Sequence, residues 1–302
     1  MKTLVLGGQG FIGSHVVDQL ISRGHEVRVY ARRAPEFATS VEWVCGDFLD
    51  TSSLSKALQG IEVVVHAVSS TVPSTSAMDP LSDIQSNLVG TVALLQLMQR
   101  MDVGRLVFLS SGGTVYGNPS TSPVSEGHPL NPISSYGAVK VAIEKFIGVA
   151  QQSWGLRPVI IRPSNPFGVR QGRSGIQGLI STVLNNIIHQ EPTKIYGDGA
   201  SIRDYIYVED LARLVVSAVD RDVCGVFNAG SGFGYSVNQI IDVVEKVTGE
   251  VVLTTKLESR GFDVREVVLE CALAKKVFGW ESTTALDVGI GYQYDWLKNL
   301  KL

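Results

Sequence analysis

Short apolar runs alternate with helical patterns through the first half of the chain. The runs lie at residues 4–7, 26–30, 41–47, 61–66, 105–111 and 157–163. Between them, apolar residues recur at helical spacing, first at Ile12, Val16 and Leu20 and then near 53–59, 81–101 and around 136–140. Continuous apolar strands separated by helices are typical of a parallel sheet covered on both faces.

The pattern becomes less regular after about residue 165. It predicts helices near 176–190, 208–219 and 236–248, with a strand at 193–197. No flexible linker separates the two parts, so we expect them to share a cleft. We predict an α/β protein with a first domain over 1–165, joined by part of 200–230, and a smaller mixed α/β C-terminal domain over 166–302.

Three glycines follow the first apolar run. Gly7, Gly10 and Gly13 form G-x-x-G-x-x-G between a strand and an amphipathic helix. Glycine permits a tight turn there and lets backbone N–H groups approach a pyrophosphate at the helix N-terminus. We therefore predict that the first domain is a Rossmann-type doubly wound sheet that binds a dinucleotide.

The end of the second strand bears on which dinucleotide binds. Where an acidic residue would hold the ribose of NAD, the chain has Ala31 followed by Arg32 and Arg33. Two guanidinium groups suit a 2′-phosphate, so the cofactor is NAD or NADP with a preference for NADP; a solvated basic turn is the alternative. Asp47, after the third strand, is a candidate acceptor for the adenine amino group.

Tyr136 and Lys140 stand four residues apart in the segment SSYGAVK. On a helix these positions share a face, so the ammonium lies beside the phenol. A fixed positive charge favours the phenolate. The pair therefore predicts a general acid/base for a substrate hydroxyl or carbonyl.

Composition excludes several classes of protein. Of 302 residues, 44% are hydrophobic and 18% charged, and the net charge is -3, which gives no sign of a nucleic-acid surface. The histidines and cysteines lack the spacing of a metal site, and no apolar stretch of about 18 residues occurs. We expect a cytoplasmic protein with no metal, nucleic-acid or membrane partner.

Several longer motifs occur in a recognisable order. They are GGQGFIGSH, NLVGT (87–91), SSGGTVYG, YGAVK, RPSNPFG (162–168), IYGDG followed by IRDYIYVEDLA (195–212), and ESRGFD (258–263). With these, the chain resembles the extended short-chain dehydrogenase/reductase family over essentially its whole length. Its pattern is most similar to the nucleotide-sugar epimerase/dehydratase branch.

The resemblance implies a role for each matching residue. Tyr136 would be the acid/base, Lys140 would hold the nicotinamide ribose, and Asn87 would brace the active-site helices. The implied cofactor-binding residues are Gly7, Gly10, Phe11, Ile12, Gly13, Arg32, Arg33, Asp47, Phe48, Ala67, Asn87, Tyr136 and Lys140. The implied substrate-binding residues are Asn165, Arg203 and Arg260 at the pyrophosphate and Tyr196 and Asp263 near the nucleoside.

Two of these substrate residues have structural alternatives, and the resemblance also bears on assembly. Arg203 could instead pair with Asp204 or Asp210, and Asn165 could stabilise a loop. Family members commonly dimerise through two long helices, so the resemblance implies a homodimer; the apolar faces near 88–98 and 139–149 fit such an interface and fit packing on the sheet equally well.

One position departs from the family pattern. A Ser or Thr usually stands four residues before the Tyr of VYG and bonds the reacting oxygen of the substrate, whereas this chain has Gly112. If the segment is extended, side chains alternate, so Thr114 points to the same side as position 112 and Ser111 points away. We therefore expect Thr114 or a water to supply the hydrogen bond.

The motifs favour one reaction over its relatives. The acidic pair that dehydratases carry beside VYG is replaced here by Gly113 and Thr114. We predict a 4-epimerase of UDP-hexoses that works through a transient 4-keto sugar. An NADPH-dependent reductase of a 4-keto-sugar nucleotide is the alternative that Arg32 and Arg33 favour, and a non-catalytic dinucleotide-binding regulator is the alternative from another class.

Overall fold

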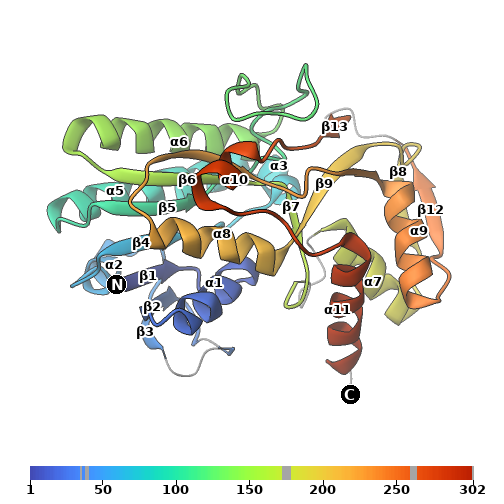
Figure 1. Ribbon diagram of the computed structural model, residues 1–302, viewed down its shortest axis with the longest axis horizontal. Coiled ribbons are helices and arrows are strands. Elements are labelled where there is room, and N and C mark those ends of the chain that lie inside the picture. The colour runs from blue at the N-terminus through green and yellow to red at the C-terminus, as the bar shows by residue number, and fades with distance from the viewer. Residues whose placement is uncertain (35, 38–40, 172–177, 259–263, 301–302) are drawn as a thin grey trace.

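The fold is given by a computed structural model (Figure 1) that describes residues 1–34, 36–37, 41–171, 178–258 and 264–300. A parallel sheet occupies one side of the molecule. Its strands are β1 (Lys2–Leu6), β2 (Glu26–Ala31), β3 (Glu42–Cys45), β4 (Val63–His66), β5 (Arg105–Leu109), β6 (Arg157–Pro163) and β10 (Gly225–Ala229). The spatial order is β10-β6-β5-β4-β1-β2-β3. The chain therefore reverses its direction across the sheet at β1, and open sheets of this kind bind ligands at the carboxyl ends of the strands near that point.

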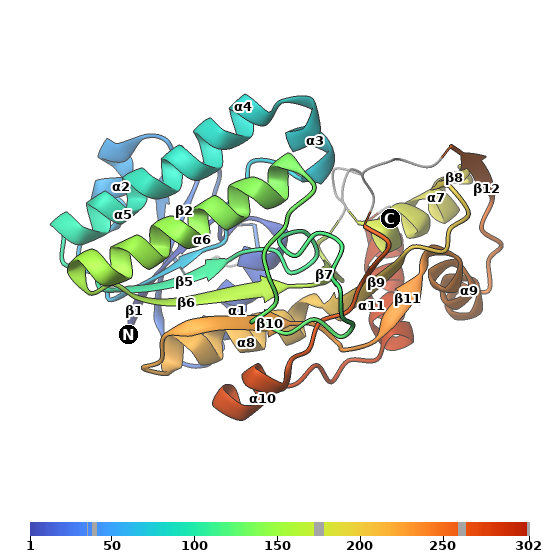
Figure 2. The same ribbon diagram turned by 90° about the horizontal axis from the view of Figure 1, so that it is seen from above.

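Helices cover both faces of this sheet (Figure 2). One face carries α1 (Phe11–Ser22), α8 (Val208–Asp220) and α10 (Ala272–Phe278), and the other carries α2 (Thr51–Ala57), α5 (Gly90–Arg100) and α6 (Ser135–Trp154). Along β1, Val5 packs into the core under α1 and α8, whereas Leu4 and Leu6 pack into the core under α2 and α5. Both faces of the strand are thus buried, which is why its sequence is a continuous apolar run.

Short elements join β4 to α5. They are α3 (Pro73–Met78), α4 (Pro80–Asp83) and the π-helix η1 (Ile84–Val89). The sequence predicts one helix over 81–101, whereas the structure has α4, η1 and α5 in succession. A π-helical turn of this kind is rare and often occurs at functional sites.

The second region lies beside the carboxyl ends of the sheet strands (Figures 1 and 2). Its elements are β7 (Asn165–Phe167), α7 (Leu179–His189), β8 (Thr193–Tyr196), β9 (Ile202–Tyr207), β11 (Gly234–Ser236), α9 (Val237–Thr248), β12 (Thr254–Leu257), β13 (Glu266–Val267) and α11 (Leu286–Asn299). Strand β9 pairs with β7, β11 and β13, and β8 pairs with β12. The side chains of Val183, Ile240 and Ile290 bury a separate core between α7, α9 and α11.

The predicted fold class is confirmed: a doubly wound parallel α/β sheet with a smaller mixed C-terminal region. The topology also places α8 and β10, from the stretch 208–229, with the large sheet. The domain boundaries 1–165 and 166–302 remain a prediction. Within the described ranges, no helix combines the length and apolar character needed to cross a membrane.

Candidate active site

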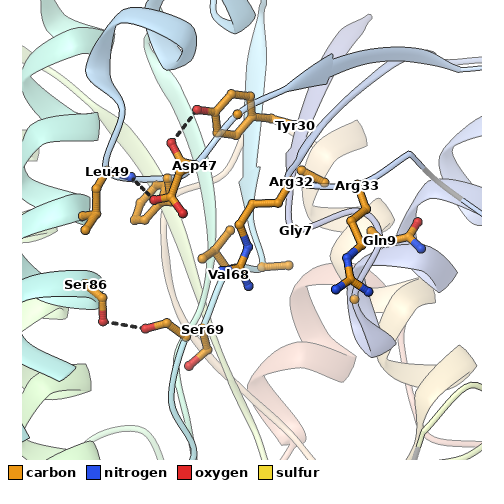
Figure 3. Close-up of a pocket in the computed structure, with 16 residues that line it drawn as sticks. Gly7, Gln9, Tyr30, Arg32, Arg33, Asp47, Leu49, Val68, Ser69 and Ser86 are labelled. Carbon is orange, nitrogen blue, oxygen red and sulfur yellow. Dashed lines mark hydrogen bonds between the residues drawn. The ribbon is translucent and has the colours of Figure 1, made fainter. Parts of the chain in front are cut away.

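A cavity of about 770 Å³ opens at the carboxyl ends of β1 to β4 (Figure 3). Each of these strands ends in a loop that contributes lining residues. They are Gly7, Gln9, Gly10, Tyr30, Ala31, Arg32, Arg33, Gly46, Asp47, Phe48, Leu49, Ala67, Val68, Ser69, Ser70 and Ser86. We call this the strand-end cavity.

The glycine motif forms one wall of the strand-end cavity. Gly7 has a φ of 79°, which favours glycine, and its N–H donates to the carbonyl of Tyr30. A Cβ on Gly13 would lie 2.2 Å from the Gly7 carbonyl oxygen, so only glycine lets α1 start this close to the turn. Gly10, the residue before α1, has no side chain that could cap the first amides of the helix. These amides are left for an anionic ligand, which fits a pyrophosphate.

The predicted cofactor residues fall into two groups. Gly7, Gly10, Arg32, Arg33, Asp47, Phe48 and Ala67 line the strand-end cavity, whereas Phe11, Ile12, Gly13, Asn87, Tyr136 and Lys140 do not. Arg32 and Arg33 are exposed at its β2 end. The side chain of Arg33 lies near Gln9 (Figure 3).

Asp47 is held by its neighbours at the rim of the cavity. Its carboxylate accepts from the Leu49 N–H at 3.0 Å, and its carbonyl accepts from the Tyr30 hydroxyl at 2.6 Å. The Tyr30 hydroxyl also lies 2.6 Å from the Ser53 hydroxyl. A Cβ on Gly46 would lie 2.4 Å from the Tyr30 oxygen, so glycine is needed where β3 ends. Asp47 thus presents an exposed carboxylate at a fixed place, as an adenine-binding residue requires.

Asn87 does not line the strand-end cavity but holds one of its lining loops in place through hydrogen bonds. Its side-chain oxygen accepts from the Ser70 N–H at 3.1 Å, and its side-chain nitrogen donates to Thr71 and to Asp83 at 3.0 and 2.7 Å. Ser70 lines the cavity, and Asn87 itself is only 3% exposed. Both ends of the amide are therefore used within the protein, and Asn87 braces η1 against the loop after β4.

Tyr136 and Lys140 lie in the first two turns of α6. Ser134 caps the helix by accepting from the Gly137 N–H. The Lys140 Nζ atom lies 5.6 Å from the centroid of the Tyr136 ring and donates to the carbonyl of Leu109 at 3.1 Å. Lys140 is 3% exposed, so its charge acts in a poorly screened environment. The pair predicted from the sequence is therefore brought together beside the end of β5.

The segment after β5 differs from the expectation. Residues 112–116 form turns rather than an extended strand, so the alternation that assigned Thr114 and Ser111 to opposite sides does not apply. A Cβ on Gly112 would lie 2.6 Å from the Leu269 side chain and 2.9 Å from the Arg162 carbonyl. A Ser or Thr at position 112 would therefore point into the core, and the glycine there is a packing requirement.

The hydroxyl of Thr114, predicted to bond substrate, lies within this turn. Its Oγ1 atom is buried and has no hydrogen-bond partner among the described residues. Its backbone carbonyl faces Gly137, where a Cβ would lie 2.8 Å away, so the turn packs closely on the start of α6. Ser111 stands at the carboxyl end of β5 and is partly exposed. Thr114 is also partly exposed, but its hydroxyl oxygen is buried, so Ser111 is the second candidate for the hydrogen bond to substrate.

A second, smaller cavity of about 210 Å³ lies in the C-terminal region. It brings together Asn165 and Arg203, both predicted from the sequence, with Phe167, Gln171, Gly178, Tyr205 and neighbouring residues. Asn165 donates to the carbonyl of Asp204 at 2.8 Å, so its side chain also links β7 to β9. Burial raises the pKa of Tyr205 to about 12, so its phenol stays neutral. We call this the β7–β9 cavity.

The remaining substrate predictions have different outcomes. Tyr196 lies on β8, is 38% exposed and does not line the β7–β9 cavity. Arg260 and Asp263 lie outside the described residues. The alternative partners of Arg203 are engaged elsewhere: the Asp204 carboxylate accepts from Ser231, Gly232 and Leu269. The Asp210 carboxylate is bonded by Arg213 and by the segment 282–284.

Sequence reasoning missed several lining residues. In the strand-end cavity these include Gln9, Ser69, Ser70 and Ser86, and in the β7–β9 cavity they include Tyr205. Ser69 and Ser70 stand in the loop that follows β4, so their position after a strand was the available signal, whereas Ser86 lies in η1 and had none. Tyr205 gave no such signal, because it lies within a strand and reads as an ordinary core aromatic.

The family of the chain follows from residues 3–230, which match the model of the NAD dependent epimerase/dehydratase family. The protein belongs to this family. It is 33% identical over 301 residues to a putative UDP-glucose 4-epimerase of Methanocaldococcus jannaschii, with 98% of each chain covered. It is also 33% identical to a UDP-glucose 4-epimerase of Mycolicibacterium smegmatis, with 99% of each covered.

Solved structures show the same likeness. The UDP-glucose 4-epimerase of Thermotoga maritima with UDP-glucose has a TM-score of 0.95 at 29% identity, covering 100% of both chains. The UDP-glucose 4-epimerase of Thermus thermophilus in complex with NAD has a TM-score of 0.93 at 30% identity, covering 99% of both. The expected preference for NADP receives no support from these relatives.

Proposed function

We propose that the protein is a UDP-hexose 4-epimerase, with UDP-glucose and UDP-galactose as the first pair to test. The observation that carries the proposal is the placement of Tyr136 and buried Lys140 on one helical face, beside the end of β5. The names of the relatives, which cover nearly the whole chain, support the choice of sugar nucleotide and reaction.

The chain's own residues supply proton transfer and binding. Tyr136 takes the proton of the C4 hydroxyl and returns one, while the Lys140 ammonium stabilises its phenolate. Ser111, rather than Thr114 with its buried hydroxyl oxygen, donates a hydrogen bond to the reacting oxygen. Arg203 and Asn165 bind the nucleotide diphosphate through charge-assisted and amide contacts. The bound nicotinamide supplies a hydride acceptor and donor.

We infer that the resident cofactor is NAD. The strand-end cavity fits a dinucleotide, because its glycine turn leaves helix amides open and its rim holds Asp47. The family description and the similar structures that contain NAD support this choice. Arg32 and Arg33 at the β2 end are the observation that favours NADP. Cofactor released from the purified protein, and the two dissociation constants, decide between them.

We also propose a homodimer. Phe146 and Val149 on α6 are 45% and 58% exposed, and Val89 beside α5 is 45% exposed. Phe146 and Val149 lie on one of the two helices that the resemblance assigns to the interface, and Val89 ends η1 just before the other, where exposed apolar groups favour association. Light scattering of the purified protein tests the assembly, and Phe146→Glu should convert a dimer to a monomer.

One experiment tests the reaction directly. Purified protein is mixed with UDP-glucose without added reductant, and UDP-galactose formation is followed, with Tyr136→Phe as the inactive variant. Tyr292→Phe, which changes an exposed tyrosine on α11, is the matched control that should stay active. Consumption of NADPH with a 4-keto sugar would identify the reductase instead. Tight cofactor binding without any turnover would favour the regulator.

A further inference from the structure

A buried ion pair lies one helical turn beyond Lys140. Glu144 on α6 is 6% exposed and Arg162 on β6 is 4% exposed. Arg162 binds both carboxylate oxygens: Nε lies 3.0 Å from Oε1 and Nη2 lies 2.6 Å from Oε2. Ser110 donates its hydroxyl to Oε1 at 2.5 Å. The carboxylate is thus held by three donors, and the planar fork of arginine suits this bidentate geometry.

Lys140 and Glu144 have the spacing of a helical ion pair. They stand at i and i+4 on α6, and both side chains are buried. Lys140 donates to the carbonyl of Leu109, and Glu144 accepts from the next residue, Ser110. The two charged groups therefore lie beside successive residues of the same strand end. In so poorly screened an environment, an uncompensated carboxylate would attract the ammonium strongly.

Arg162 also holds the turn after β5 in place through a hydrogen bond to Tyr116. Its Nη1 atom donates to the Tyr116 hydroxyl at 2.9 Å, and that hydroxyl donates to the Asn228 side chain at 2.7 Å. Burial opposes the charge of Arg162, but the hydrogen bonds and charges of Glu144 and Tyr116 together outweigh it, so the pKa of Arg162 lies above its usual value. Arg162 is consequently charged at every working pH.

We propose that Arg162 is a positioning residue: by occupying both oxygens of Glu144, it prevents that carboxylate from pairing with Lys140 and keeps the ammonium beside Tyr136. The inference deepens the proposed function and rests on Tyr136 as its acid/base. Other ionisable groups face this site. His66 on β4 is neutral, because burial and then Lys140 lower its pKa to about 3. Asp83 on α4 is bonded by Thr71 and Asn87, and Glu126 is bonded by the Asn228 N–H.

The test is the pH profile of kcat in matched variants. In Arg162→Met, the Glu144 carboxylate is free to pair with the Lys140 ammonium. The acidic limb of the kcat profile should therefore move to higher pH by about one unit, and kcat at neutral pH should fall about tenfold or more. The double variant Arg162→Met with Glu144→Gln should return the limb to its original place. Ser110→Ala should leave the limb unmoved, because it frees no carboxylate to compete for Lys140, and Glu144→Gln should not move the limb up, because it removes the competing carboxylate. A merely structural role predicts changes in stability and in kcat without movement of the acidic limb in any of these variants.

A second readout does not depend on the substrate. The ultraviolet absorbance of tyrosinate is titrated with NAD bound, and each variant is compared with the same variant carrying Tyr136→Phe. The titration should shift in Arg162→Met even if the protein fails to turn over UDP-glucose, which separates this inference from the proposed function. A fall in kcat without any shift, or a shift retained in the double variant, would overturn it. If Arg162→Met does not fold, Arg162→Lys should show a smaller shift in the same direction, and no shift there would equally overturn it.

Discussion

The strand-end cavity and the β7–β9 cavity are built in different ways. The first is lined by loops after successive strands of one sheet, all between residues 7 and 86. The second gathers residues from β7, α7, β9 and the start of α9, spread over 165 to 237. A binding site made by parallel strand ends is fixed by the sheet itself, whereas the second depends on how separate segments pack. The two sites should therefore respond to different substitutions.

The largest effect is expected at Gly13. In Gly13→Ala the new Cβ would lie 2.2 Å from a backbone oxygen, which cannot move without breaking the turn. We expect a loss of at least about 2 kcal/mol, or about thirtyfold in the dissociation constant of NAD. Gly291→Ala in α11 is the control, since its Cβ would make only an ordinary contact at 3.7 Å. Calorimetric titration with NAD measures both, and unchanged binding in Gly13→Ala would contradict the glycine cradle.

The second-largest effect tests whether the two cavities bind their ligands independently. Arg203→Gln should raise the KM for UDP-glucose about tenfold to a hundredfold, because a charge-assisted contact worth about 1.5–3 kcal/mol is lost. Binding of NAD should not change, since Arg203 does not line the strand-end cavity. Lys194→Gln removes an exposed charge from the same region on β8 and serves as the control. Equal losses of sugar nucleotide and NAD affinity would show that the two cavities do not act separately.

The difference between the strand-end cavity and the β7–β9 cavity also explains how much of each could be predicted from the sequence. The glycine motif, Arg32, Arg33 and Asp47 could be placed because each follows an apolar run, and the sheet brings strand ends together. Tyr136 and Lys140 could be paired because a helix has a fixed repeat. The turn at 112–116 could not be predicted, because Leu269, 157 residues after Gly112, decides which way that position points. Asn165 and Arg203 were placed by resemblance alone.

A smaller effect tests which hydroxyl, that of Ser111 or that of Thr114, bonds the reacting oxygen. Ser111→Ala should lower kcat about tenfold with little change in KM, because a donor to the reacting oxygen is lost. Thr114→Val, which removes a covered hydroxyl of nearly the same shape, should leave kcat within about twofold. Initial rates over a range of UDP-glucose concentrations separate the two parameters. The reverse result would restore Thr114 as the partner of Tyr136.

The smallest effect concerns the contact between the two regions. His15 on α1 lies 3.0 Å from the carbonyl of Val169, which follows β7, and burial lowers the pKa of His15 to about 4. A histidine whose folded pKa is below its unfolded value stabilises the protein above the unfolded value and loses this contribution as pH falls through the folded one. The free energy of unfolding should therefore drop by about 1–2 kcal/mol from pH 7 to pH 5 through this residue.

The matched variants for this effect are His15→Gln and His189→Gln. His15→Gln keeps a donor for the Val169 carbonyl but cannot gain a charge, so it should flatten the pH dependence. His189 is exposed at the end of α7, and its replacement should leave the pH dependence as in the natural chain. Urea unfolding at several pH values measures the difference. If His15→Gln loses stability in acid as steeply as the natural chain, the contact between α1 and the β7 segment does not carry the pH sensitivity, and the two regions are coupled through other residues.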